Sequence, residues 1–233
     1  MPSCSRRRFL GLCSALAATI AGGRALAGPL QAHPRMPLIG SDGRPLGPED
    51  LMVGEAYVFC YPYRATPCFL LRLDRPAPPL TLETESGRRY RWQGGVGPEK
   101  TVVAFAAICS HRLTYPTPAV SFIGYRVQPP PALPTATGGV IHCCSENSLY
   151  DPARGARVLS GPAPQPLAAV ALEDGEEGLV ATGVYGGTLY KRFFDTFGFR
   201  LELEYGAGRA RQRVSGGCPV MTLAQYSRQR MLC

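Results

Sequence analysis

Two short cysteine-containing segments carry the residues of this chain that are best suited to chemistry. The first is Cys109-Ser110-His111, and the second runs from Cys143 to Asp151 and reads Cys-Cys-Ser-Glu-Asn-Ser-Leu-Tyr-Asp. Thiolate sulfur and imidazole nitrogen are good ligands for transition metals. Each segment follows an apolar run that is typical of a strand, so each is expected to form a loop at a strand end. The two loops together predict a metal site.

A third segment, Gly161-Pro162-Ala163-Pro164, follows at the distance expected of a loop that covers such a site. The three segments resemble the Rieske iron–sulfur family, whose pattern is C-x-H, then C-x-C-H-G-S-x-[FY]-D, then G-P-A. The resemblance implies a [2Fe-2S] cluster in which two thiolates hold one iron and two imidazoles hold the other. It implies that Cys109 and Cys143 are the thiolate ligands and that His111 is the first imidazole ligand.

The position of the second imidazole ligand is not occupied by histidine. The alignment that keeps the serine, tyrosine and aspartate of the second segment in their family places puts Glu146 there. A carboxylate ligand adds negative charge and should lower the potential. A second alignment starts at Cys144 and puts Asn147, a poor iron ligand, at this position. His142 is a third candidate, ranked lower because adjacent residues of an extended segment point in opposite directions.

The resemblance also implies roles for residues around the ligands. Ser148 and Tyr150 match residues whose hydroxyls, in high-potential members of the family, donate hydrogen bonds to cluster sulfurs. Such donors stabilise the more negative, reduced cluster and raise its potential. Two further family cysteines, which clamp the loops through a disulfide, align with Thr114 and Ser145. Without that disulfide the loops are expected to be looser unless other contacts hold them.

Short apolar runs that alternate with turn signals predict an all-β fold. The expected strands cover residues 56–59, 69–73, 80–82, 101–108, 140–141, 167–172 and 178–181. The run 101–108 is apolar on both faces, so it is expected to be a central strand that delivers Cys109 from a rigid base. The resemblance implies a Rieske-like antiparallel β-sandwich base with a small cluster-binding subdomain.

The sequence predicts four parts along the chain. These are a twin-arginine signal peptide (1–27), a linker (28–51), a Rieske-like domain (52–183) and a C-terminal extension (184–233). In the extension, residues 191–198 predict a short helix or turn, the alternation in 200–205 predicts a strand, and a solvated basic tail is expected to follow. The 31 residues between His111 and Cys143 are expected to form an inserted surface excursion.

The signal peptide is predicted from three features in order. Residues 5–10 read Ser-Arg-Arg-Arg-Phe-Leu, a 13-residue apolar stretch begins at Phe9, and the small-residue site Ala25-Leu26-Ala27 follows. The twin-arginine route exports folded proteins, which indicates the periplasm. A membrane span needs about 20 apolar residues. A cleaved signal is therefore favoured over an uncleaved one that tethers the protein to the inner membrane.

Charge and cysteine content limit the remaining possibilities. Removal of residues 1–27, which hold four arginines and no acidic residue, lowers the formal charge from +8 to +4. Because no basic run with interleaved aromatics appears, no nucleic-acid partner is expected. Disulfides are the default for cysteines in an exported protein. Candidate pairs are Cys60 with Cys68, across a predicted hairpin, and Cys218 with Cys233.

The resemblance implies a one-electron carrier that serves as the iron–sulfur subunit of a membrane-associated quinol-oxidising respiratory complex. Such a chain is an electron-transfer subunit of an oxidoreductase rather than a stand-alone enzyme. The implied partners are a membrane-bound redox subunit, such as a quinol-oxidising cytochrome, and a c-type cytochrome acceptor. The missing histidine supports an alternative, a cluster-free Rieske-like structural or assembly subunit.

Two other metal functions fit the sequence less well. Structural zinc favours ligands two to four residues apart within each knuckle, and C-x-H with an adjacent Cys-Cys pair fits that spacing badly. A catalytic oxygenase needs a second iron site with two histidines and a carboxylate. His33 is the one histidine that lies outside the two loop segments and their preceding strands.

Overall fold

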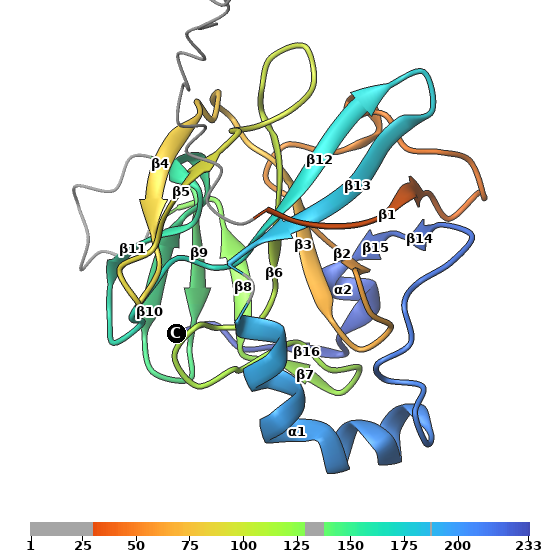
Figure 1. The fold of residues 1–233 in the computed structure, drawn as a ribbon. Helices are drawn as coiled ribbons and strands as arrows, with labels where there is room; N and C mark the ends of the chain where they lie inside the picture. Colours follow the sequence, from red (N-terminus) through yellow and green to blue (C-terminus); the bar gives the residue numbers. More distant parts are fainter. Residues whose placement is uncertain (1–29, 129–137, 187) are drawn as a thin grey trace, which may run out of the picture.

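The computed structural model describes residues 30–128, 138–186 and 188–233 (Figure 1). The predicted signal peptide lies outside these residues. Strands dominate the described chain, so the predicted all-β fold is confirmed. Within the described ranges, no helix has both the length and the apolar character needed to cross a membrane.

The base of the molecule is an eight-stranded sheet in the order β14-β1-β13-β12-β6-β3-β2-β15. Its strands are β1 (Leu30–Ile39), β2 (Ala56–Cys60), β3 (Pro67–Arg72), β6 (Val102–Ala106), β12 (Ala169–Gly175), β13 (Gly178–Tyr185), β14 (Cys218–Pro219) and β15 (Met221–Thr222). β14, at one end of this order, contacts β2 near the other end. The sheet therefore curls until it is nearly closed around one apolar core.

A smaller antiparallel sheet, in the order β11-β10-β9-β8, lies beside the base (Figure 1). Its strands are β8 (Ile123–Arg126), β9 (Val140–Cys143), β10 (Ser148–Asp151) and β11 (Arg157–Ser160). Two-stranded sheets pair β4 (Leu80–Glu83) with β5 (Arg89–Trp92), and β7 (Val120–Ser121) with β16 (Gln229–Arg230). The 3₁₀ turns are η1 (Pro48–Asp50) and η2 (Pro152–Arg154).

The expected excursion between the two cysteine segments is more than a surface loop. It contributes β7 and β8, and β8 pairs along the whole of β9, which ends at Cys143. Residues 129–137 of the excursion lie outside the described ranges. The insertion therefore completes the sheet that carries the second cysteine loop.

β6 separates two apolar cores, as its two-faced apolar sequence predicted. Alternate residues belong to the core inside the curled base, namely Val102, Ala104, Ala106 and Ile108. The residues between them belong to the core shared with the small sheet, namely Val103, Phe105, Ala107 and Cys109. Burying a large side chain such as Phe105 stabilises the fold by about 1.5–3 kcal/mol. This alternation delivers Cys109 to the core that also contains Cys143.

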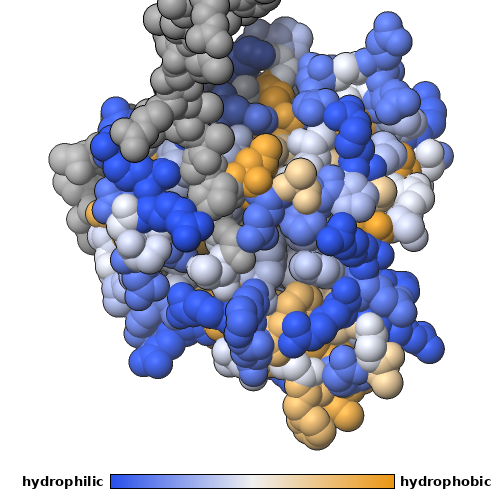
Figure 2. All heavy atoms as spheres, viewed as in Figure 1, coloured by the Kyte–Doolittle hydropathy of each residue, from blue (hydrophilic) through white to orange (hydrophobic). Residues whose placement is uncertain are grey.

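The C-terminal part differs from its sequence prediction. A single 17-residue helix, α1 (Leu189–Tyr205), covers 191–198, where a short helix or turn was expected, and continues through 200–205 in place of the expected strand. Leu201 is buried in the base core, whereas Leu203 is 72% exposed. The leucine alternation is therefore not a strand pattern, and the buried positions follow helical spacing instead. Phe199 and Leu203 of α1 are exposed. Figure 2 shows an apolar patch at the bottom of the view, where α1 lies in Figure 1.

Two further predictions about the ends are wrong. The expected linker contains β1, which pairs with β13 despite a register shift between Ala32 and Met36. Two prolines in this segment, Pro34 and Pro37, obscured its strand character. The expected solvated tail is folded back, since β14, β15, α2 (Leu223–Tyr226) and β16 all pack on the rest of the chain.

Candidate metal centre

The two cysteine loops lie side by side in the core between the base and the small sheet. Cys109 follows β6 and is 2% exposed, and Cys143 ends β9 and is 1% exposed. The two thiols lie close enough for Cys143 to be the largest influence on the pKa of Cys109, and for Cys109 to be the largest influence on the pKa of Cys143. The structure thus brings together the two predicted thiolate ligands, which are 34 positions apart in the sequence.

Strand alternation explains which side chains accompany Cys143. In the β9–β10 pair, Cys143 is opposite Ser148 and Ile141 is opposite Tyr150. Opposite residues of an antiparallel pair lie on the same face. All four are buried, and Cys143, Ile141 and Tyr150 share one core. His142 points away from this face, toward Cys233.

The Tyr150 hydroxyl, which belongs to the second segment, contacts the first cysteine loop. Its oxygen is 3.2 Å from the Cys109 sulfur and 3.3 Å from the Ser110 hydroxyl oxygen. The Ser110 hydroxyl donates its own proton to the backbone carbonyl of Gln165 at 2.7 Å. Tyr150 is therefore free to donate its proton to the Cys109 sulfur.

The electrostatics of the pair favour one thiolate. The hydrogen bond from Cys143 lowers the pKa of Cys109 to about 6 and outweighs burial, and bonds from Tyr150 and two backbone N–H groups act in the same direction. The pKa of Cys143 is raised because it retains the proton that it shares with Cys109. Burial, and then the nearby charge of Cys109, raise the pKa of Tyr150, so the phenol keeps its proton.

Thr114 and Ser145, the positions of the family disulfide, contact the Cys143 sulfur in a different way. The Ser145 backbone N–H and the Thr114 hydroxyl are polar groups near this sulfur, and each partly lowers the pKa of Cys143. Polar groups near one ligand sulfur thus stand where the resemblance implies a disulfide.

A second pair of donor groups is His111 with Glu146. A carboxylate oxygen of Glu146 lies 3.4 Å from His111 Nδ1, and its other oxygen is 3.0 Å from Nε of Arg112. The His111 and Glu146 side chains are 23% and 42% exposed. Glu146, the fourth ligand of the first alignment, is therefore beside the predicted histidine ligand, and Arg112 balances its charge.

Two buried atoms of the predicted site residues lack hydrogen-bond partners. His111 Nδ1 has none, because its 3.4 Å approach to Glu146 is an ion-pair distance without hydrogen-bond geometry. Ser148 Oγ has none either. Leaving a buried polar group unsatisfied costs about 1–3 kcal/mol. A nitrogen free to bind iron and a hydroxyl free to reach a cluster sulfur both fit a [2Fe-2S] group at this site.

The third segment contacts the second loop, and the residue that follows it contacts the first. Gly161 has φ +91°, and a Cβ on it would lie 2.6 Å from the Ser148 Cα. Only glycine allows this approach to the second loop. Gln165, just after the segment, accepts the bond from Ser110 in the first loop.

Cys144 does not face the site. It forms a disulfide with Cys233, so the second alignment, which makes Cys144 a metal ligand, does not fit this structure. Of the five described cysteines outside this disulfide, Cys60, Cys68 and Cys218 are unpaired. The two candidate bridges, Cys60 with Cys68 and Cys218 with Cys233, are therefore wrong. Cys68 is opposite Phe59 rather than Cys60 in the β2–β3 pair.

A second His/Cys group lies on the outer side of β9. His142, Cys144 and Cys233 have donor atoms within 4.8 Å of one another. His142 Nε2 is 3.3 Å from the Cys233 sulfur, and Arg126 approaches His142 Nδ1 to 3.2 Å. Burial, and then the Arg126 charge, lower the pKa of His142. With both sulfurs in a disulfide, this group offers a metal only the imidazole.

Comparison with solved structures finds similar chains. The chain is similar to the soluble domain of the Rieske protein II (soxF) from Sulfolobus acidocaldarius, with 26% sequence identity and a TM-score of 0.46 over 65% of this chain and 78% of that chain. No family model and no curated protein matches the chain. The assignment of the site therefore depends on its own residues and their geometry.

Sequence reasoning missed three contributors to the site. Arg112 acts through an ion pair with Glu146, and Gln165 acts through its backbone carbonyl. Neither contact can be predicted from the residue type. Cys233 was assigned to a different partner. The one available signal was the Cys143-Cys144 dipeptide, because neighbouring strand residues point to opposite faces and require different partners.

Proposed function

We propose that this chain is a periplasmic one-electron carrier with a [2Fe-2S] Rieske-type cluster. The observation that carries the proposal is the arrangement of two donor pairs. Cys109 and Cys143 form a buried sulfur pair, and His111 and Glu146 form a nitrogen and oxygen pair beside it. One pair offers sulfur ligands and the other offers nitrogen and oxygen ligands, which suits a cluster whose two irons have different ligands.

Cys109 and Cys143 would hold one iron, and His111 with Glu146 would hold the other. When bound, the cluster would accept and release one electron. The protein's own contribution is electrostatic. Tyr150 donates toward the Cys109 sulfur, and the unpaired Ser148 hydroxyl is available as a second donor. Both would favour the reduced form, while the Glu146 carboxylate would oppose it and Arg112 would offset part of that charge.

The proposed role is the iron–sulfur subunit of a membrane-associated quinol-oxidising respiratory complex. The His111 side chain supports this role, because it is 23% exposed although its Nδ1 atom is buried, so part of it can contact a partner. The partners would be a membrane-bound redox subunit, such as a quinol-oxidising cytochrome, and a c-type cytochrome acceptor.

Periplasmic location is proposed from the Ser5 to Leu10 pattern and the Ala25-Leu26-Ala27 site. Changing Arg6 and Arg7 together to lysine should stop export of the folded protein, and fractionation of cells measures this. Normal periplasmic amounts of the variant would show that another route is used. The size of the exported chain separates a cleaved signal from one retained as an inner-membrane tether.

One observation favours the alternative, a cluster-free Rieske-like structural or assembly subunit. Glu146 is satisfied without a metal, since it pairs with Arg112 at 3.0 Å. Iron and acid-labile sulfide analysis, together with an EPR spectrum of the reduced protein exported in its native host, decides between the two. Equal amounts of iron and sulfide with a [2Fe-2S] signal support the carrier. Folded protein without either supports the cluster-free subunit.

A further inference from the structure

Residues 227–233 form a strap along the segment that follows the first ligand loop. β16 pairs in parallel with β7, and the Ser227 hydroxyl donates to the Thr117 carbonyl at 2.7 Å. Backbone N–H groups of Arg228 and Met231 donate to the carbonyls of Pro118 and Ser121, at 3.1 and 2.9 Å. The strap is thereby hydrogen-bonded to residues 117–121 along almost its whole length.

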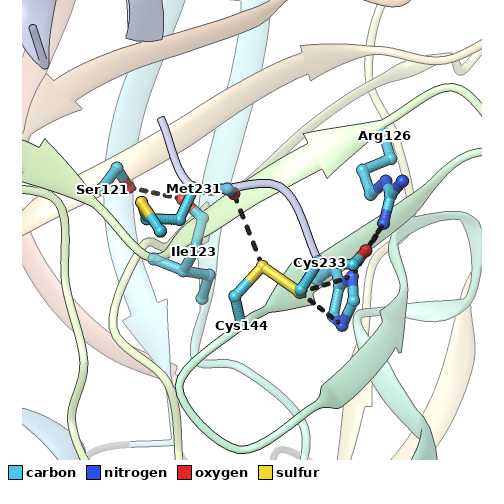
Figure 3. Close-up of a disulfide and its surroundings, with 7 residues drawn as sticks. Ser121, Ile123, Arg126, Cys144, Met231 and Cys233 are labelled. Atoms are coloured by element: carbon cyan, nitrogen blue, oxygen red, sulfur yellow. Dashed lines mark hydrogen bonds between the residues drawn. A yellow bond between two sulfur atoms is a disulfide. The ribbon is translucent and has the colours of Figure 1, made fainter. Parts of the chain in front are cut away.

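The end of the strap is covalently bound to the second ligand loop. Figure 3 shows the disulfide between Cys233 and Cys144, the residue that follows Cys143. Arg126 on β8 also donates to the Cys233 carbonyl. The strap therefore connects the segment that follows the first loop, through residues 117–121, with the second loop, through Cys144.

Little apolar burial holds this end of the strap. Met231 is 47% exposed and Leu232 is 77% exposed. The strap also borders a pocket of about 370 Å³ that Arg126, His142 and Arg228 line. Because hydrophobic stabilisation scales with the apolar area removed from water, the disulfide is the main bond that keeps the strap on the second loop.

We propose that this strap is the clamp that fixes the two ligand loops relative to each other, and that reduction of its disulfide releases the cluster. The inference rests on the proposed function for its cluster-related part. Cys144 and Cys233 are positioning residues, since they act on the cluster through Cys143. A dithiol reductant would open the clamp: the S–S bond breaks, two electrons and two protons pass from the dithiol, and the dithiol becomes a cyclic disulfide.

The test compares three proteins in the full chain: wild type, the double variant Cys144→Ser/Cys233→Ser, and Cys60→Ser as a control that removes an unpaired thiol from the base. Amide hydrogen exchange is measured on iron-free and iron-loaded samples, and iron transfer to a chelator is timed on loaded samples. The double variant should exchange faster at 111–121 and 144–147 but not in β3 or β6. Its iron should be lost roughly tenfold to a hundredfold faster, as for other changes around metal ligands.

Unchanged exchange in both ligand loops of the double variant would overturn the proposal, and so would faster exchange spread evenly over the base. If the double variant does not fold, wild-type protein treated with a dithiol replaces it, and untreated wild-type protein is the control. If no protein binds iron, the carrier function fails, while the exchange data on iron-free samples still decide whether the strap clamps the loops.

Discussion

Cys143 and Cys144 are adjacent in the chain, yet the two sides of β9 give them opposite chemistry. Cys143 is buried beside Cys109, and its thiol takes part in a hydrogen-bonded pair. Cys144 faces the other side and is oxidised in a disulfide with Cys233. One side of the strand thus offers thiols for a metal, and the other offers a covalent anchor. A Cys-Cys dipeptide at a strand end is therefore not two equivalent ligands.

The largest expected difference between the two sides is in iron content. Cys109→Ala and Cys143→Ala should each abolish iron binding, because one iron would then be left with a single thiolate. Cys144→Ala should still contain iron when assayed directly after purification. Iron per protein, measured by colorimetric assay on folded samples, makes the comparison. Full iron in Cys143→Ala would invert the roles assigned to the two neighbours.

The disulfide between Cys144 and Cys233 is expected to contribute strongly to the free energy of unfolding. The bridge closes a loop with a sequence separation of 89 residues, for which the chain-entropy model gives about 4–5 kcal/mol. Urea unfolding of the iron-free Cys144→Ser/Cys233→Ser protein should show a loss of this order. A reducing agent should destabilise the wild type to a similar extent and leave the variant unaffected. Equal stability of the two oxidised proteins would mean that the bridge does not form.

The same contrast explains what the sequence could predict. Cys109, His111 and Cys143 were predictable because each is fixed locally, by a strand that ends just before or at the cysteine. The partner of Cys144 was not, since Cys233 reaches it only through the return of the C-terminal segment to β7. The helix α1 was not predictable either. In the sequence Leu201 and Leu203 fit the alternation of a strand, and only the base core shows that Leu201 is buried while Leu203 is exposed.

The buried thiol pair should make the stability of the iron-free protein depend on pH. The pKa of Cys109 is lowered to about 6 from 9.0, so its ionisation stabilises the fold at pH 9 and this contribution is lost as the pH falls to 6. The pKa of Cys143 is raised above 9.0, so the fold loses stability above pH 9. Unfolding free energies across this range should pass through a maximum near pH 9. In Cys109→Ser the unfolding free energy should no longer increase between pH 6 and pH 9. An unchanged dependence on pH would contradict a proton shared between Cys109 and Cys143.

Glu146 tests whether the second donor pair contains a carboxylate ligand. Glu146→His should keep the iron and raise the midpoint potential, because a neutral ligand replaces an anionic one. Glu146→Gln should reduce iron retention, since it removes the charge without adding a good ligand. Both variants break the ion pair with Arg112. A difference between them in iron content or midpoint potential therefore shows whether the side chain at position 146 binds iron. Identical iron content and potential in the two would assign Glu146 to Arg112 alone.

The smallest effect concerns the hydroxyls on the Cys143 side of β10. Tyr150 lies 3.2 Å from the Cys109 sulfur, and a hydrogen bond to a charged acceptor is worth about 1.5–3 kcal/mol in total. Only the part that differs between the oxidised and reduced cluster changes the potential, and about 59 mV corresponds to a tenfold change for one electron. Tyr150→Phe should therefore lower the midpoint potential of the cluster by roughly some tens of millivolts.

Ser148→Ala should also lower the midpoint potential, because the Ser148 Oγ has no protein partner in competition with a cluster sulfur. Potentiometric titration measures both. Leu149→Ala, a change on the opposite face of the same strand, should leave the midpoint unchanged, and a shift equal to that of Tyr150→Phe would mean that packing rather than the hydroxyl sets the potential.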